Sequence, residues 1–424
     1  MCVLSLARAL ARMLTLAGLV AGLTAPAVRQ PAVPPASHST PVLDWVNPLE
    51  VDGFCEPGGW GFHADPTKLP LLVFLPGMDG SLFTPFMQYP ELGSKFELAC
   101  MCHVDGLSSR ASFDELVENC AHFVASHTSS GRRVMMVGES FGATLALGVL
   151  NRLGPDNQPA GAVLVNPATS YQRSILSTLG PAATALPQPF YSLSLLVLAA
   201  LVLEPAQFPS FVTLILALRQ PALLATPARE AFLGRVLLSA LLGIASGPQF
   251  MIGPLLKPSI FRSADLAFRL SSWLDAGATK VEDTLPMIGT PLLVIAGERD
   301  RLLPSVEEAE RLFSRVPKTM RKGIVVVPCA GHASTLGTQL DLAAEIERAF
   351  AFELGLPRAE DKNLEMSQAV CSPTGAPTQQ SKIEARWANG LIPRQYEPLS
   401  VSQYREWNRQ GKHCPLPGLA AKES

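Results

Sequence analysis

Short apolar segments recur along this chain, and helical patterns separate them. Each segment is rich in Val, Leu and Ile and is bounded by Gly or Pro, and six fit this description: residues 69–77, 96–104, 132–140, 160–168, 290–298 and 323–331. Strands that lack a polar face are typical of a parallel sheet covered on both sides. Apolar stripes at helical spacing occupy residues 116–124, 306–316 and 342–350. The alternation predicts an α/β domain with a mostly parallel sheet.

The composition limits the size and the partners of the protein. A chain of 424 residues exceeds the usual size of one core, which favours one large domain with extensions, or two domains. Hydrophobic residues make up 48% and charged residues only 17%, so we expect some apolar surface that contacts lipid-like groups. The net charge of -2 provides no basic field, and we expect no nucleic-acid partner.

The eight cysteines are scattered, and none has the C-x-x-C spacing of a zinc site. Cys100 and Cys102 flank Met101 in an expected strand, where both side chains would lie on one face and would not form a bridge. We therefore expect buried or free thiols, with disulfides elsewhere left open. No metal and no cofactor are expected.

The N-terminal segment has the pattern of a targeting signal. Residues 1–43 contain no Asp or Glu, and Arg8 and Arg12 precede a short apolar run that ends in small residues. The run is shorter than the roughly 20 residues of a membrane span, which makes a membrane anchor the weaker alternative. The acid-free segment that follows, with Ser and Pro, is typical of an organelle transit region. We expect import into a compartment, with the plastid favoured and the secretory pathway or membrane association as alternatives.

Two regions follow the targeting segment, and the first contains an insertion. Residues 44–356 form the expected α/β domain, and residues 171–285 interrupt its pattern with an apolar, Pro-rich insertion. The insertion is interpreted as a helical cap over the ligand edge of the sheet, with a helical subdomain that has its own core as the alternative. Residues 357–424 are predicted to be a linker and a polar tail, which either docks on the domain or stays loose.

Gly138, Ser140 and Gly142 match the G-x-S-x-G pattern, which chance alone would produce in roughly one chain in seven of this length. The context raises its significance, because the pattern follows an expected strand and opens an expected helix. A nucleophile elbow requires this arrangement, with the serine at a strained turn and glycines that let neighbouring backbone approach. We predict that Ser140 is a nucleophile; the alternative is a serine that caps the helix.

A serine nucleophile needs a base and an acid that orients the base. His332 is the histidine that follows the pattern within the sheet-forming region, directly after an apolar strand. Asp300 follows the strand at 290–298, and Glu298 is its nearest competitor. We predict His332 as the base and Asp300 as the acid; the alternatives are a structural histidine and a loop carboxylate.

An oxyanion formed at the serine needs two backbone N–H donors. The loop after the strand at 69–77 is in the usual position for one of them, and Met78 is the first choice. Phe141, which follows the nucleophile, is the expected second donor. Asp79 in the same loop fits a structural role better than that of the acid.

These segments resemble the plant and algal esterase/lipase/thioesterase family of α/β-hydrolases that includes the phytyl ester synthases. The resemblance runs from about residue 70 to 354 and rests on the segments LPLLVFLPGMDGSLF, MMVGESFGATLALGV, VLVNPATSY and VIAGERDRLLPSVEEAERL. It implies an α/β-hydrolase fold with a helical cap inserted after the sixth strand, the one that ends in NPATS. It also implies that the catalytic serine, acid and histidine fall on Ser140, Asp300 and His332.

The chain departs from the family in several places. Glu139 and Ala143 stand where the family commonly has Asp and Gly. The larger members continue into an acyltransferase-like domain with an H-x-x-x-x-D signature, and no such pattern follows His332. We therefore expect a serine esterase, lipase-type hydrolase or acyltransferase of lipid metabolism that acts on lipophilic esters or acyl thioesters, with peripheral association with membranes or lipid droplets. The alternatives are phytyl ester synthesis, chlorophyll dephytylation and a catalytically inactive lipid-binding scaffold.

Overall fold

The computed structural model describes residues 42–48, 69–80, 84–85, 88–187, 190–191, 194–195, 262–337, 340–355 and 398–410. The expected targeting segment, apart from its last two residues, lies outside this part of the chain. So do most of the expected cap and the linker. Within the described residues, no helix combines the length and the apolar character needed to cross a membrane.

The described part of the chain forms an eight-stranded sheet with the order β1-β3-β2-β4-β5-β6-β7-β8. Its strands are β1 (Leu43–Val46), β2 (Leu71–Leu75), β3 (Glu97–His103), β4 (Val134–Glu139), β5 (Gly161–Val165), β6 (Leu292–Gly297), β7 (Arg321–Val327) and β8 (Leu399–Ser400). Strands β3, β2, β4, β5, β6 and β7 are parallel in that order, and the two edge strands run antiparallel to them. The expected mostly parallel α/β sheet is confirmed.

The central strands are apolar, apart from Glu139 at the end of β4, because both faces of the sheet are covered. Every residue of β2, β4, β5 and β6 is buried. The helices are α2 (Tyr89–Gly93), α3 (Phe113–Ser129), α4 (Phe141–Arg152), α5 (Leu176–Thr184), α10 (Ser263–Arg269), α11 (Ala276–Glu282), α12 (Ser305–Arg315), α13 (Leu342–Leu354) and α16 (Val401–Arg409). Shorter turns are the 3-10 helices η3 (Gly106–Ser108), η4 (Pro155–Asn157), η5 (Ala168–Arg173), η8 (Leu285–Met287), η9 (Lys318–Met320) and η10 (Ser334–Leu336).

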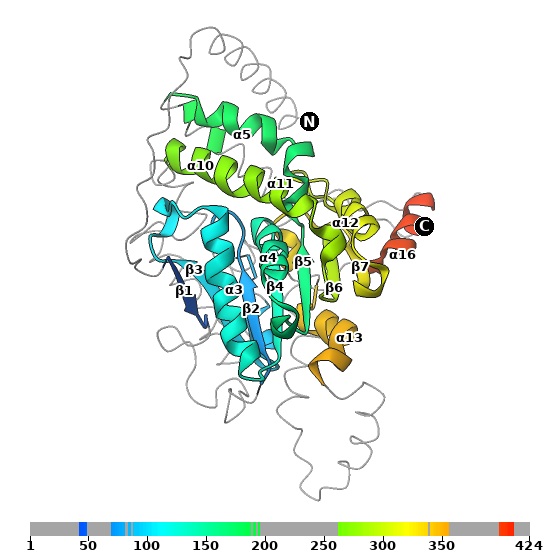
Figure 1. Cartoon of the computed structure of the whole chain (residues 1–424). Helices are drawn as coiled ribbons and strands as arrows, with labels where there is room; N and C mark the ends of the chain where they lie inside the picture. The colour runs from blue at the N-terminus through cyan, green and yellow to red at the C-terminus, as the bar shows by residue number, and fades with distance from the viewer. Residues whose placement is uncertain are drawn as a thin grey trace, which may run out of the picture.

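Two apolar clusters fill the two sides of the sheet. The larger cluster contains the inward faces of α3, α4, α11 and α12, and the smaller contains those of α2 and α13. Helix α3 begins with a capping box, in which the Ser112 side chain accepts from the Glu115 N–H and the Glu115 carboxylate accepts from the Ser112 N–H. The layers are visible in Figure 1, with α3 and α4 in front of the strands.

The described ends of the insertion consist of helices. The 3-10 helix η5 follows β5, and α5 comes next; the chain returns through α10, the π-helix η7 (Leu270–Asp275) and α11. In Figure 1 these helices lie together at one end of the sheet. The insertion follows β5, which is the fifth strand among the described residues. The family resemblance had implied an insertion after the sixth strand, and this expectation does not fit the described part of the chain.

Both edges of the sheet differ from the expected boundaries. Strand β1 begins at Leu43, the last residue of the expected targeting segment, because it pairs with His103 at the end of β3. At the other edge, part of the expected tail docks: Leu399 and Ser400 pair with Val326 and Val325 of β7. Helix α16 continues from this short strand and contacts β7.

Candidate active site

Ser140 lies at a strained turn between β4 and α4. Its φ of 54° and ψ of -113° are in a backbone region that residues other than glycine rarely adopt. A Cβ on Gly142 would lie 1.9 Å from the carbonyl oxygen of Leu75, and one on Gly138 would lie 2.4 Å from that of Gly142. Both glycines are therefore required by close backbone contact, as an elbow demands.

The Ser140 side chain faces a histidine and an aspartate. Its Oγ is 3.0 Å from Nε2 of His332, and Nδ1 of His332 is 2.7 Å from Oδ2 of Asp300. Ser140 occupies the N-cap position of α4, but among the described residues its side chain accepts no capping hydrogen bond. The alternative interpretation as a helix-capping serine is therefore wrong.

The side chain of Asp300 is fully buried and held by several donors. The N–H groups of Leu302 and Leu303 donate to Oδ1 at 2.9 and 3.0 Å, and the Ser305 hydroxyl donates to Oδ2 at 2.5 Å. Burial raises the pKa of Asp300, but the charge of His332 and these hydrogen bonds outweigh it and hold the pKa below its ordinary value. Asp300 is therefore an ionised partner for the imidazole.

The competing carboxylate has a different partner. Glu298 accepts a hydrogen bond from the Cys329 N–H at 2.8 Å, which ties the end of β6 to the turn after β7. That turn leads to His332, so Glu298 acts on the loop that carries the histidine, while Asp300 contacts the imidazole itself. The structure thus brings together the three predicted side chains Ser140, Asp300 and His332.

His332 is buried, with 6% of its surface exposed. Burial lowers its pKa, but the charge of Asp300 and their hydrogen bond, with smaller effects of Glu139 and Asp79, raise it above its ordinary value. Since Nδ1 faces a carboxylate, Nδ1 carries the proton in the neutral ring. Nε2 is then left to accept the proton of the Ser140 hydroxyl.

Asn166, in the NPATS segment, holds the histidine loop and was missed by the sequence reasoning. Its Nδ2 donates to the carbonyl oxygen of His332 at 2.8 Å and to the Thr335 hydroxyl at 2.9 Å. Its Oδ1 accepts from the Gly297 N–H at 2.8 Å, and its φ is 45°. One side chain therefore links β5, β6 and the histidine loop. The unusual NPATS segment was the available signal for it.

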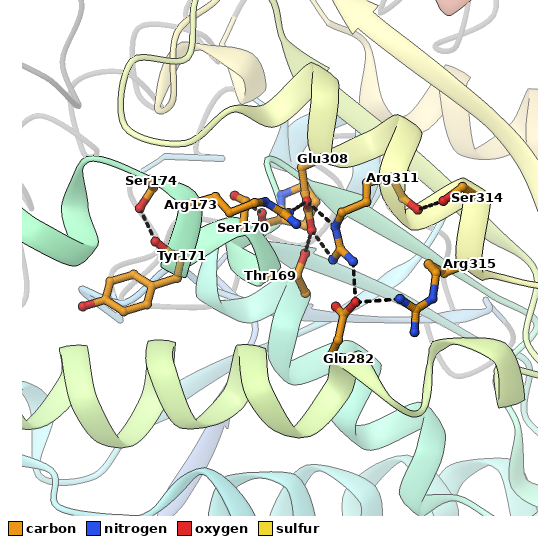
Figure 2. A network of polar contacts seen from close by, with 11 residues as sticks. Thr169, Ser170, Tyr171, Arg173, Ser174, Glu282, Glu308, Arg311, Ser314 and Arg315 are labelled. Atoms are coloured by element: carbon orange, nitrogen blue, oxygen red, sulfur yellow. Dashed lines mark hydrogen bonds and ion pairs between the residues drawn. The ribbon is translucent and has the colours of Figure 1, made fainter.

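An ion network around the buried side chain of Glu308 joins the same segment to the helix that follows the acid (Figure 2). Glu308 of α12 has a fully buried side chain, accepts from the hydroxyl of Thr169, and pairs with Arg173 and Arg311. Arg311 also pairs with Glu282 of α11 at 2.7 Å. The network ties η5, at the start of the insertion, to α12, whose first residue, Ser305, contacts Asp300.

The expected oxyanion loop lies beside the nucleophile. A Cβ on Gly77 would lie 3.7 Å from the Cβ of Ser140, so the segment that leads to Met78 approaches the serine closely. Phe141 is the first residue of α4, where backbone N–H groups point out of the helix end. The donor roles of Met78 and Phe141 remain predictions.

Two further carboxylates lie near the triad. Glu139 precedes the serine, and burial, together with the charge of Asp79, raises its pKa to about 8. Asp79 also contributes to the raised pKa of His332, so its charge acts on the site although it is not the partner of the imidazole. At neutral pH, Glu139 is therefore mostly protonated.

The cysteines agree in part with the expectation of free thiols. Cys100, Cys102 and Cys120 are free, and Cys329 is disulfide-bonded. A disulfide outside the Cys100 and Cys102 pair had been left open, because sequence spacing carries no signal for a bond between distant segments. In the part of the chain that the structure describes, no group of three or more His, Cys, Asp or Glu side chains could hold a metal ion.

Comparisons with known proteins give one family and two curated relatives. Phytyl ester synthase 1 of Arabidopsis thaliana chloroplasts is 29% identical over 247 residues, which cover 57% of this chain and 32% of the relative. Phytyl ester synthase 2, from the same source, is 32% identical over 145 residues, which cover 34% of this chain and 18% of the relative. The expected resemblance is confirmed, and the matches span a third or less of these relatives.

The solved structure of a hydrolase from Pseudomonas aeruginosa PA01 is 19% identical and covers 69% of this chain and 92% of its own, with a TM-score of 0.45. The sequence pattern of the Alpha/beta hydrolase family matches residues 72–345, which contain all three side chains of the site. The chain belongs to the alpha/beta hydrolase family.

Proposed function

We propose that the protein is a serine-dependent ester hydrolase or acyltransferase that acts on lipophilic acyl esters through an acyl-serine intermediate. The continuous line of hydrogen bonds from Ser140 through His332 to Asp300, at 3.0 and 2.7 Å, supports this proposal most strongly. The three side chains follow β4, β7 and β6 at the same edge of the parallel sheet. Each is thus fixed by a different strand of a rigid scaffold.

In the first step the Oγ of Ser140 attacks the carbonyl carbon of the ester, and its proton passes to Nε2 of His332. The carbonyl oxygen becomes an oxyanion, for which the N–H groups of Met78 and Phe141 are the proposed donors. The C–O bond to the alcohol then breaks, and the alcohol leaves with the proton from Nε2. Asp300 keeps the ring in the correct tautomer and stabilises its cation.

In the second step an acceptor attacks the acyl-serine. Water gives the free acid, whereas an alcohol gives a new ester; in both cases His332 takes the proton of the acceptor and returns it to Oγ. The competition between the two acceptors decides whether the protein is a hydrolase or a transferase. The same three side chains serve both reactions.

The substrate class is proposed from the sequence of the insertion. Residues 190–203 form an uncharged apolar run, which suits the entrance of a site for lipophilic esters such as acylglycerols, galactolipids or acyl thioesters. A second candidate is transfer to or from an isoprenoid alcohol, as in phytyl ester synthesis or chlorophyll dephytylation. The two curated relatives, both named phytyl ester synthases, favour this candidate.

The proposal is tested by ester turnover of matched serine variants. Wild type, Ser140→Ala and Ser174→Ala are compared on p-nitrophenyl esters of increasing chain length; Ser174 is a buried serine whose hydroxyl donates to the carbonyl of Tyr171. We expect turnover that increases with chain length, falls at least about 10³-fold in Ser140→Ala and persists in Ser174→Ala. Turnover retained by Ser140→Ala contradicts the proposal, and a wild type that binds lipid without turnover points to the inactive scaffold.

Transfer is separated from hydrolysis by offering a fatty acyl thioester together with phytol. Formation of phytyl ester that depends on Ser140 supports transfer, and release of free acid alone supports hydrolysis.

Plastid import is the proposed route for the N-terminal segment, which a fluorescent fusion of residues 1–43 tests directly. Flotation with liposomes tests the proposed peripheral association with membranes.

A further inference from the structure

Arg269 is a buried cation that the proposed reaction leaves without a role. It is the last residue of α10 and has 0% of its surface exposed. Its Nη1 donates to the carbonyl oxygen of Met78, and its Nη2 donates to that of Gly106 at 2.9 Å. The guanidinium therefore connects the returning end of the insertion to the loop of the first proposed oxyanion donor.

The Arg269 side chain also lies over the ring of Trp273, which contacts Phe141, the residue of the second proposed donor. Cζ of Arg269 lies 4.3 Å from the ring centroid of Trp273, which is fully buried and donates through Nε1 to the Ala111 carbonyl at 2.7 Å. Trp273 stacks on Phe141, with ring centroids 5.1 Å apart and an interplanar angle of 15°. Arg269 and Trp273 thus contact both residues from which the oxyanion donors are proposed to come.

The charges around Arg269 keep it cationic. Burial lowers its pKa to about 10, and the carboxylates of Asp79 and Asp265 oppose this decrease. The neighbouring ring of His103 stacks on Trp273, and burial, with the charge of Arg269, lowers the pKa of His103 to about 3. His103 is therefore neutral at physiological pH and adds no positive charge beside the guanidinium.

The hydrogen bond to Met78 restricts the peptide on which the loop geometry depends. The hydrogen bond to the carbonyl of Met78 fixes the peptide plane between Met78 and Asp79. The N–H of Met78 belongs to the neighbouring peptide, between Gly77 and Met78, and its rotation is limited because one side of Met78 is held. The π-helix η7 begins directly after Arg269 and places Trp273 within reach of Phe141. Displacements of about 1 Å in such groups are enough to slow a reaction strongly.

We propose that Arg269 is a positioning residue that holds the Met78 loop and, through Trp273, Phe141 in the geometry that stabilises the oxyanion at Ser140. This inference rests on the proposed function. It also gives the insertion a role in catalysis, because α10 carries the side chain that fixes the oxyanion loop. Substrate contacts that move α10 would then change the rate of the chemical step.

The test compares Arg269→Met, Arg269→Lys and the control Arg132→Met in the full-length protein. Arg132 likewise donates to a backbone carbonyl, that of Leu69, but it precedes β4, whereas Ser140 follows the other end of that strand. Hydrolysis of a p-nitrophenyl ester gives kcat and KM. Inhibition by a trifluoromethyl ketone, whose adduct with the serine carries an oxyanion, gives Ki, and urea unfolding identifies variants that are merely unstable.

For Arg269→Met we expect kcat to fall by roughly 10- to 100-fold and Ki to rise by a similar factor, with KM changed by less than about threefold. Arg269→Lys, which keeps one donor for Met78, should recover part of kcat, and Arg132→Met should keep the kcat of the wild type. Equal kinetics of Arg269→Met and Arg132→Met, or a loss confined to KM, would overturn this inference alone. A wild type without Ser140-dependent ester turnover, by hydrolysis or by transfer to an alcohol, would overturn the proposed function and this inference with it.

Discussion

Asn166→Ala is the substitution whose effect on stability can be worked out most fully from the structure. Asn166 is fully buried, and its amide satisfies the Gly297 N–H and the His332 carbonyl. Each buried group left without a partner destabilises the fold by about 1–3 kcal/mol. Alanine at a φ of 45° adds about 1 kcal/mol. We expect the free energy of unfolding to fall by about 3–7 kcal/mol, a large part of the roughly 5–15 kcal/mol of an ordinary domain.

Urea unfolding followed by circular dichroism measures this change, with two matched variants. Asn166→Gly loses the same hydrogen bonds but relaxes the backbone, so we expect it to be about 1 kcal/mol more stable than Asn166→Ala. Asn151→Ala removes an amide that donates to Leu147 and Thr284 near the surface, and we expect a loss of about 1 kcal/mol. A loss in Asn166→Ala no larger than that in Asn151→Ala would refute the role assigned to Asn166.

Two further predictions concern pH. The pKa of Glu139 is raised to about 8, so the folded chain keeps a proton that the unfolded chain releases above about pH 4.5. The stability that this group contributes therefore falls as pH rises from about 4.5 to about 8, by an amount on the order of 5 kcal/mol in total, and the loss is complete once pH has passed about 8. Glu139→Gln should reduce the loss between pH 5 and 9 in urea unfolding, and an unchanged loss contradicts the assignment. The second prediction is an acidic limb of kcat/KM with its midpoint above the ordinary value of 6.5, because the base must be neutral and the pKa of His332 is raised. Asp300→Asn should move that midpoint down, and a wild-type midpoint below 6.5 would contradict the argument.

The elements that the sequence predicted carry strong local signals. The central strands are apolar runs, apart from Glu139 at the end of β4, because both faces of the sheet are covered. Ser140 lies in a short pattern whose glycines are forced by contacts of less than 3 Å. Asp300 and His332 could be predicted as acid and base because each follows such a strand. Their order along the chain after Ser140 also matches the order serine, acid, histidine.

The contacts that hold the site were not predictable in the same way. Asn166 bonds a loop 166 residues further along the chain, and Glu308 accepts from Thr169 across 139 residues. Polar side chains of this kind have no periodic signature, so only the fold reveals their partners. The docking of the tail was also left open. Strand β8 has only two residues, which is too short for a recognisable strand pattern.

The proposed acyl intermediate requires that Ser140 is an activated nucleophile. Intact-mass spectrometry of the full-length protein after brief exposure to a fluorophosphonate, followed by peptide mapping, tests it directly. We predict a single adduct on Ser140 in the wild type, none in Ser140→Ala, and protection of the wild type by a long-chain ester. An adduct on another residue, or an equal adduct in Ser140→Ala, would contradict the account.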